Sequence, residues 1–367
     1  MRKLRKRLKL SKRLLLRRFE KAYAYNAKTD SLYELDEEAL NFFISLDGKE
    51  VEIEEELYEY LRREGFFGNS LPDFKEQKEF PSLRYLLVHV TYNCNLKCEH
   101  CYVEKRDVFM DQEVFESLAR NFYEMGGLKL IVTGGEPLTH PKIFDFLRIA
   151  RKYPYRIVLL TNGLLIDERT ARELSKLVDE VQISLDGLNG HKMLRGVDYR
   201  VVVEKIKLLR ELVDVSVATM ITKYNLEELE RMKDLVESLK VKSWNIDFPS
   251  CSEEIVPDFD KASLISLGFG EAHEAAEGYL CGTHLASVTP KGEVTKCGFF
   301  EDTVGDVFDL EDAWRELRRK YIWSLSELKC KCDFVRECKG GCRYRALHYS
   351  GDIFGEDPVM CAIFKAR

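Results

Sequence analysis

The sequence of 367 residues contains no run of about 18 apolar residues, roughly what a helix needs to cross a bilayer, so no membrane-spanning segment is expected. The N-terminal residues also lack the apolar stretch of a signal peptide, which predicts a cytoplasmic protein. Glutamine occurs only three times, whereas charged residues make up 33% of the chain, a balance typical of heat-adapted proteins. The sequence therefore argues first against membrane and secreted proteins.

Cysteine, by contrast, is abundant, with eleven residues in the chain. Disulfides are rare in the cytoplasm, and these cysteines are clustered rather than scattered. Both observations favour metal ligation. The positive charge is also concentrated, because residues 1–18 hold ten lysines and arginines and no acid, while the formal net charge is −6. Such a segment can bind nucleic acid or an acidic peptide, but we expect a solvated, partly disordered arm without a nucleic-acid partner.

A small α+β module is predicted after the arm, at residues 19–67, followed by a linker at 68–84 that is rich in turn-forming residues. The two strands of the module can bind an extended peptide by strand addition, and the alternative is a cap packed against the next domain. The predicted elements are strands at 22–25 and 31–35 and helices at 37–45 and 54–63. The residues expected to flank a peptide are Tyr23, Tyr25, Leu32 and Tyr33.

Strand-like and helix-like segments alternate across residues 85–248, which predicts an α/β fold with a parallel sheet and right-handed crossovers. In parallel barrels the chemistry lies at the carboxyl ends of the strands. Residues 249–280 break the alternation and are expected to bridge to a cysteine-rich region at 281–367. The predicted strands are 86–91, 129–133, 156–160, 180–185, 215–222 and 243–248.

Three cysteines, Cys94, Cys98 and Cys101, follow the first of these strands with the spacing C-x3-C-x2-C. Iron–sulfur clusters are usually held by four thiolates, so three on one loop leave one iron of a cubane open to another ligand. A zinc site is the alternative, but zinc prefers four ligands and the loop has no evident fourth. The spacing resembles that of radical S-adenosylmethionine (SAM) enzymes, in which the open iron binds SAM and the cluster cleaves it to a 5′-deoxyadenosyl radical. The resemblance implies a partial (β/α)6 TIM-like barrel.

Further residues at the predicted strand ends match the SAM-binding positions of that superfamily. The motif Gly134, Gly135, Glu136, Pro137 corresponds to the one that receives the SAM amino group. The resemblance also implies a SAM contact for Ser184 and a SAM carboxylate contact for Arg195. Asp247, at the end of the sixth strand, is expected to be a base or substrate contact, or else a solvated aspartate. Weaker cofactor-binding candidates are Tyr102, Asn162, Asp186 and Thr222.

The C-terminal cysteines resemble the SPASM domain, which carries two auxiliary [4Fe–4S] clusters. That resemblance assigns Cys281, Cys297 and Cys342 to the first cluster. The chain departs from the pattern because Cys330 and Cys332 are separated by one residue instead of two, and because the first cluster lacks a nearby fourth cysteine. The fourth iron of the first cluster is expected either to be open or to be bound by Cys251. A zinc ribbon is the alternative for the seven C-terminal cysteines. The second cluster is assigned Cys330, Cys332, Cys338 and Cys361.

The resemblance implies an enzyme that abstracts hydrogen from a peptide or protein during maturation, with a ferredoxin- or flavodoxin-like reductant. The segment 19–67 weakly resembles the leader-peptide module of peptide maturases. Alternative functions are maturation of a tungsten-dependent oxidoreductase, modification of tetrapyrrole side chains in the haem pathway, and electron transfer without catalysis.

Overall fold

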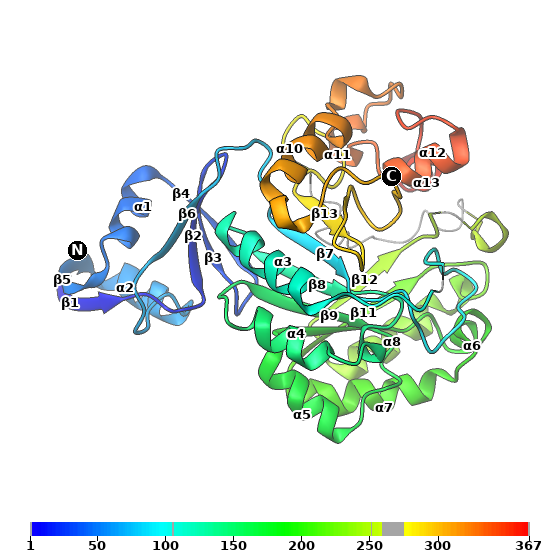
Figure 1. Ribbon diagram of the computed structural model, residues 1–367, viewed down its shortest axis with the longest axis horizontal. Coiled ribbons are helices and arrows are strands. Elements are labelled where there is room, and N and C mark those ends of the chain that lie inside the picture. Colours follow the sequence, from blue (N-terminus) through cyan, green and yellow to red (C-terminus); the bar gives the residue numbers. More distant parts are fainter. Residues whose placement is uncertain (1, 105, 251, 259–274, 366–367) are drawn as a thin grey trace.

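The computed structural model describes residues 2–104, 106–250, 252–258 and 275–365. Its centre is an eight-stranded sheet in the order β12-β11-β10-β9-β8-β7-β13-β14 (Figure 1). The predicted barrel strands are β7 (Tyr85–His89), β8 (Lys129–Thr133), β9 (Arg156–Thr161), β10 (Glu180–Ser184), β11 (Asp214–Met220) and β12 (Ser243–Asp247). The helices along them are α3 (Gln112–Glu124), α4 (Ile143–Ala150), α5 (Glu168–Leu177), α6 (Asn189–Arg195), α7 (Tyr199–Arg210) and α8 (Leu229–Leu239). The predicted partial (β/α)6 barrel is confirmed.

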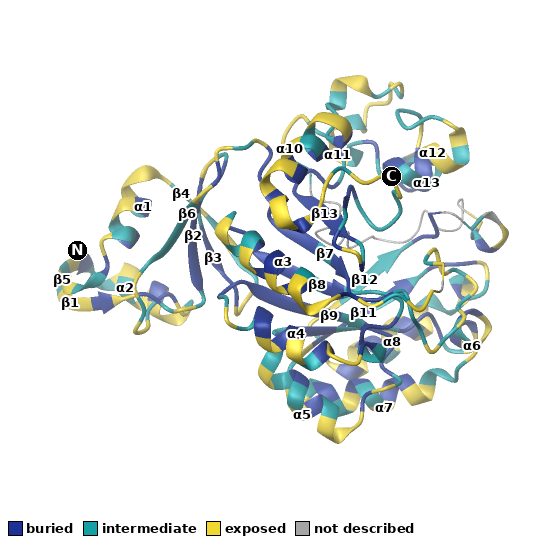
Figure 2. Cartoon of the chain, viewed as in Figure 1, coloured by how far each residue is buried: buried dark blue, intermediate teal, exposed yellow. Residues whose placement is uncertain are grey.

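The barrel core forms because alternate strand residues face the helices. Leu86 and Val88 of β7 are fully buried, and Phe115 of α3 stacks on Phe146 of α4 with ring centroids 4.5 Å apart. Burying a side chain of this size contributes about 1.5–3 kcal/mol. Figure 2 shows the resulting contrast between buried strands and the exposed outer faces of the helices. The same packing leaves the carboxyl ends of the strands free for loops.

The sheet continues into the C-terminal region through two strands that were not predicted. β13 (Leu285–Val288) runs parallel to β7, and β14 (Val294–Thr295) pairs antiparallel with β13. Strands this short carry too little periodicity to be recognised in the sequence. The helices that follow are α10 (Leu310–Tyr321), α11 (Val335–Cys338), α12 (Arg343–Ser350) and α13 (Pro358–Lys365). Short 3-10 turns are η1 (Pro137–Thr139), η2 (Leu226–Glu228), η3 (Glu253–Ile255), η5 (Val307–Asp309) and η6 (Leu325–Glu327). In the described part of the chain, no helix is long and apolar enough to cross a membrane.

The expectation of a solvated N-terminal arm is wrong for the described residues, which form β1 (Lys3–Lys9) and β2 (Leu14–Arg18). β2 is central in a sheet of order β4-β3-β2-β6, because its leucines at 14–16 supply a run of buried side chains. The predicted hairpin β3 (Ala22–Asn26), β4 (Ser31–Leu35) and helices α1 (Glu37–Ile44), α2 (Glu55–Arg63) are present. The analysis missed β5 (Asp47–Glu54) and, inside the supposed linker, β6 (Asp73–Glu76).

The basic residues of β1 are matched by the acidic strand β5. Lys3 lies opposite Glu54, Arg5 opposite Glu52 and Arg7 opposite Glu50 in this antiparallel pair. Cross-strand pairs of opposite charge stabilise a ribbon. The positive charge that suggested a preference for acidic peptides is therefore balanced within the module.

The hairpin turn between β3 and β4 closes the amino-terminal end of the barrel. Arg156, which is fully buried, donates to the backbone oxygens of Ala27 at 3.1 Å and Lys28 at 3.0 Å. Lys129 donates to Asp30 at 2.6 Å, and Arg156 also donates to Glu180 at 2.6 Å. These contacts support the cap interpretation for the turn, because removing it would take hydrogen-bond partners away from two buried cations of the barrel.

Candidate functional site

Cys94, Cys98 and Cys101 lie together in the loop after β7. Burial raises the pKa of Cys98 to about 11, the Arg195 guanidinium opposes this rise, and the thiols of Cys101 and Cys94 add to it. The three sulfurs are thus within electrostatic reach of one another. Cysteine binds metal as thiolate, and the charge of the metal itself drives the deprotonation. This donor set fits a cluster with three protein ligands.

The glycines of the Gly134–Pro137 motif let the loop after β8 pack against the cysteine loop. A Cβ atom at Gly134 would overlap the backbone oxygen of Thr91, and one at Gly135 would overlap that of Asn93. The Gly135 amide also donates to Thr91 O at 2.8 Å. Glycine is required here by the close approach of two backbones.

Glu136 ties the ends of β8 and β9 together. Its buried carboxylate accepts hydrogen bonds from the Thr161 hydroxyl and the Asn162 amide, both at 2.8 Å, and from the Leu138 amide at 3.1 Å. Burial raises the pKa of Glu136, and these donors oppose the rise. A carboxylate has about four acceptor positions, so one remains for an ammonium group. Pro137 begins η1 beside it.

Asp186 and Arg195 form a buried ion pair that reaches the cysteine loop. Arg195 Nε donates to Asp186 at 2.5 Å, and the other carboxylate oxygen accepts from the Met220 amide at 2.8 Å. Burial works against the ionised form, yet the Arg195 charge holds the pKa of Asp186 below its usual range. Arg195 also donates to Cys98 Sγ at 3.8 Å. Asp186 thus acts on the loop through Arg195.

The other predicted cofactor-binding residues differ in exposure. Ser184 ends β10 half-buried, whereas Asn162 is buried and donates to Asn95 of the cysteine loop at 2.8 Å. Thr222 is fully buried, and its amide donates to the Asn225 side chain at 2.7 Å. Thr222 therefore holds the turn after β11, while Ser184 and Asn162 lie at neighbouring strand ends.

Aromatic rings join the cysteine loop to the C-terminal region. Tyr102 packs on Phe299 with centroids 4.5 Å apart, and Phe299 stacks on Tyr344 at 5.2 Å. His89, the last residue of β7, lies edge-on to Tyr102 and is 3% exposed. Within the described residues, neither of its ring nitrogens has a hydrogen-bond partner, and burial lowers the pKa of His89 to about 4. A buried polar group without a partner is rare and calls for an explanation, such as an ordered water or a bound ligand.

Asp247 ends β12 and faces the C-terminal region. Its carboxylate accepts from the Phe248 amide at 2.8 Å and lies 3.5 Å from Arg345. The Asp247 side chain remains 44% exposed, so the position at the barrel mouth that was predicted for it is compatible with a substrate contact.

The C-terminal cysteines lie in two groups, and their assignment as cluster ligands stays a prediction. Cys281 is an electrostatic neighbour of both Cys297 and Cys342, whose thiol pKa burial raises to about 12 while Arg345 opposes the rise. The remaining four, Cys330 included, line one small cavity of about 30 Å³, together with Phe334 and Met360. These four are Cys330, Cys332, Cys338 and Cys361. Cys251 lies outside the described residues.

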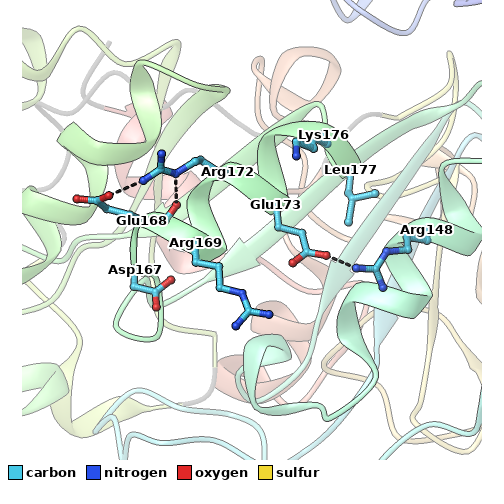
Figure 3. Close-up of a pocket in the computed structure, with 8 residues that line it drawn as sticks. All are labelled: Arg148, Asp167, Glu168, Arg169, Arg172, Glu173, Lys176 and Leu177. Carbon is cyan, nitrogen blue, oxygen red and sulfur yellow. Dashed lines mark hydrogen bonds and ion pairs between the residues drawn. The ribbon is translucent and has the colours of Figure 1, made fainter.

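A large surface pocket lies elsewhere, between α4 and α5, with a volume of about 830 Å³ (Figure 3). Its charged side chains are exposed and pair with one another, as Arg172 does with Glu168 and Arg148 with Glu173. Exposed pairs contribute roughly 0–1 kcal/mol and carry no chemistry of their own. The cysteine sites are therefore the better candidates despite their smaller cavities.

His89, Arg345 and Asp357 were not among the residues predicted from the sequence. A polar residue at the end of an apolar strand could have indicated His89, because strand ends carry the chemistry of such barrels. Asp357 precedes Pro358 at the start of α13, a typical helix N-terminus. No sequence signal distinguishes Arg345 from the neighbouring Arg343, because only the fold decides which guanidinium meets Asp357.

Comparisons with known proteins agree with this geometry. Residues 88–236 match the Radical SAM superfamily. The AdoMet-dependent heme synthase of Methanosarcina barkeri is 27% identical over 334 residues, which cover 75% of this chain and 95% of that protein. The subtilosin biosynthesis protein AlbA of Bacillus subtilis is 28% identical over 312 residues, or 74% of this chain and 69% of AlbA. The crystal structure of Streptococcus suis SuiB bound to precursor peptide SuiA has the same fold, with a TM-score of 0.70, 16% identity and coverage of 96% and 99%.

Proposed function

Because this chain is an enzyme of the radical SAM superfamily, we propose that it acts as a SPASM-type maturase that abstracts hydrogen from a peptide or protein. The observation that carries this proposal is the extent of the fold shared with the peptide-bound SuiB, which reaches 96% of the chain. That extent includes the N-terminal module.

Cys94, Cys98 and Cys101 would hold the [4Fe–4S] cluster that binds SAM, and the two C-terminal groups would hold the auxiliary clusters. When bound, the first cluster supplies the electron that cleaves SAM to a 5′-deoxyadenosyl radical. The Glu136 carboxylate has an acceptor position left for the SAM amino group. Arg195 keeps a positive charge beside the loop, suited to the SAM carboxylate.

The chain also keeps the barrel interior apart from water. The hairpin turn at residues 27–30 seals the amino-terminal end, so a substrate reaches the strand ends from the opposite side, where Asp247 and Tyr102 are partly exposed. Asp247 would contact the substrate there. Water exclusion is the protein's main contribution in radical chemistry, since it suppresses side reactions.

The residues of the N-terminal module that were proposed from the sequence to bind a peptide need revision. β4 is an edge strand of its sheet, and Leu32 on it is 36% exposed. Tyr25, however, is buried and donates its hydroxyl to Asp30 at 2.6 Å, so it serves the cap at the barrel end. A peptide would therefore add along β4, beside Leu32 and Tyr33.

Tetrapyrrole side-chain modification is the second candidate, favoured by the relation to heme synthases over three quarters of the chain. The test compares a porphyrin with a set of peptides as substrates in anaerobic assays with reduced, iron-loaded enzyme and SAM. One is Fe-coproporphyrin III, and the others are synthetic peptides copied from short reading frames beside the gene. A mass change in a peptide with stoichiometric 5′-deoxyadenosine supports the maturase. Modification of the porphyrin alone assigns the haem pathway instead.

A further inference from the structure

A buried ion pair, Arg345–Asp357, lies between the two groups of C-terminal cysteines. Arg345 Nε donates to Asp357 Oδ1 at 2.8 Å and its terminal nitrogen donates to Oδ2 at 2.9 Å, with both side chains 1% exposed. A buried ion pair is weak evidence for stability, because desolvation costs about as much as the attraction returns. Its retention between two cysteine groups calls for another role.

Asp357 contacts residues from both groups. Its Oδ2 accepts from the Cys342 amide at 2.8 Å, and its backbone oxygen accepts from the Cys361 amide at 2.9 Å. The carboxylate also accepts from the Val359 amide at 3.1 Å, at the start of the helix that carries Cys361. One residue thus fixes a predicted ligand of each auxiliary cluster.

Arg345 also makes longer contacts on its other side, with the end of β12. It donates to Phe248 O at 3.4 Å and lies 3.5 Å from Asp247 at the end of β12. It is also within electrostatic reach of the Cys342 thiol. The guanidinium therefore stands at a fixed place between the barrel mouth and the site of Cys281, Cys297 and Cys342.

We propose that Arg345, oriented by Asp357, is a positioning residue that raises the reduction potential of the auxiliary cluster at Cys281, Cys297 and Cys342. Reduction adds one electron and hence one negative charge to the cluster, and a fixed buried cation stabilises the reduced form. Asp357 both aims the cation and partly cancels its charge, as residues behind metal ligands do. A higher potential suits a cluster that accepts an electron from a substrate radical. This inference rests on the proposed auxiliary cluster.

The test is a dithionite titration of the full-length, iron-loaded protein, followed by EPR, in which the relevant signal is identified by its loss in Cys297→Ala. Arg345→Gln removes the cation and should lower the potential. Asp357→Asn keeps an acceptor for the Cys342 amide but removes the negative charge, so it should raise the potential. Arg345→Lys retains the charge and should remain closest to the native value. Arg319→Gln, whose side chain is 78% exposed, is the matched control and should cause no shift.

Opposite shifts in the first two variants are the result that supports the proposal, because a purely structural ion pair would not shift the potential in opposite directions. Shifts of the same sign, or none, overturn it. Should Arg345→Gln fail to load iron, the Asp357→Asn shift decides: upward supports the proposal, and downward or absent rejects it. If native protein shows no cluster that depends on Cys297, the auxiliary-cluster assignment fails and this proposal falls with it. If the cluster is present but its potential changes in neither the Arg345 nor the Asp357 variant, this proposal is rejected and the auxiliary-cluster assignment stands.

Discussion

The two ends of the barrel treat their buried polar groups in opposite ways. At the amino-terminal end, the charges of Arg156, Lys129 and Glu180 are paired among themselves or with the N-terminal module. At the carboxyl end, His89 is equally buried but has no hydrogen-bond partner among the described residues, and the thiols of the cysteine loop face one another. The contrast concerns these charges and His89, since the Nε atom of Arg156 also has no hydrogen-bond partner among the described residues. Paired charges stabilise the seal, whereas an unpartnered buried imidazole calls for its own explanation.

The largest expected effect is at the carboxyl end. Replacing Cys94, Cys98 and Cys101 together by alanine should abolish 5′-deoxyadenosine production and remove about four of roughly twelve irons, because three thiolates on one loop hold one cubane. Iron analysis and chromatographic detection of 5′-deoxyadenosine check this. The auxiliary clusters serve as the internal control, since their iron should remain. Continued SAM cleavage in the triple variant would place the reactive site elsewhere.

The next effect breaks the amino-terminal seal. Arg156→Met should lower the free energy of unfolding by about 3–5 kcal/mol, because it leaves Glu180 and the backbone oxygens of the turn without their buried cation. Denaturant unfolding measures this. Arg148→Met removes a side chain that is 51% exposed and should cost at most about 1 kcal/mol. Equal losses in the two variants would contradict the contrast between seal and surface.

His89 supplies a pH-dependent test of the unpaired end. Its pKa is about 4 when folded and about 6.5 when unfolded, so the unfolded chain binds more protons between these values. The free energy of unfolding should therefore fall as the pH drops from 6.5 towards 4, and the total loss due to His89 should be about 3 kcal/mol. His89→Phe keeps the ring without titrating and should flatten this part of the stability curve of metal-free protein. If stability depends on pH as steeply in the His89→Phe variant as in the native protein, His89 must have a hydrogen-bond partner in the folded protein.

The smallest effect concerns the large pocket between α4 and α5. Arg172→Ala should change the free energy of unfolding by at most about 1 kcal/mol and leave 5′-deoxyadenosine production intact, because its ion pair with Glu168 is exposed. Parallel stability and activity assays measure both quantities. A clear loss of activity would show that pocket size, rather than incomplete pairing, identifies the functional site.

Local patterns in the sequence were sufficient for the six barrel strands, the cysteine loop and the glycine motif, because each depends on residues close together in the chain. The spacing of Cys94, Cys98 and Cys101 places three thiols on one loop whatever surrounds it. The division of the C-terminal cysteines into two groups also followed from the sequence, through the resemblance to a known arrangement. The strands, the cysteine loop and the glycine motif could be predicted because neighbouring residues determine them, whereas the cysteine grouping needed the resemblance.

Only the tertiary structure decided the contacts between distant segments. The basic N-terminus became a strand because β5, more than 40 residues later, offers matching acids. The hairpin turn at 27–30 closes the barrel end because it accepts hydrogen bonds from Arg156 and Lys129. β13 extends the sheet because it pairs with the edge of β7 that β8 leaves free. Burial and charge pairing between remote residues are properties of the assembled fold. They place Arg345 and Asp357 between the two groups of C-terminal cysteines, a position that no local pattern encodes.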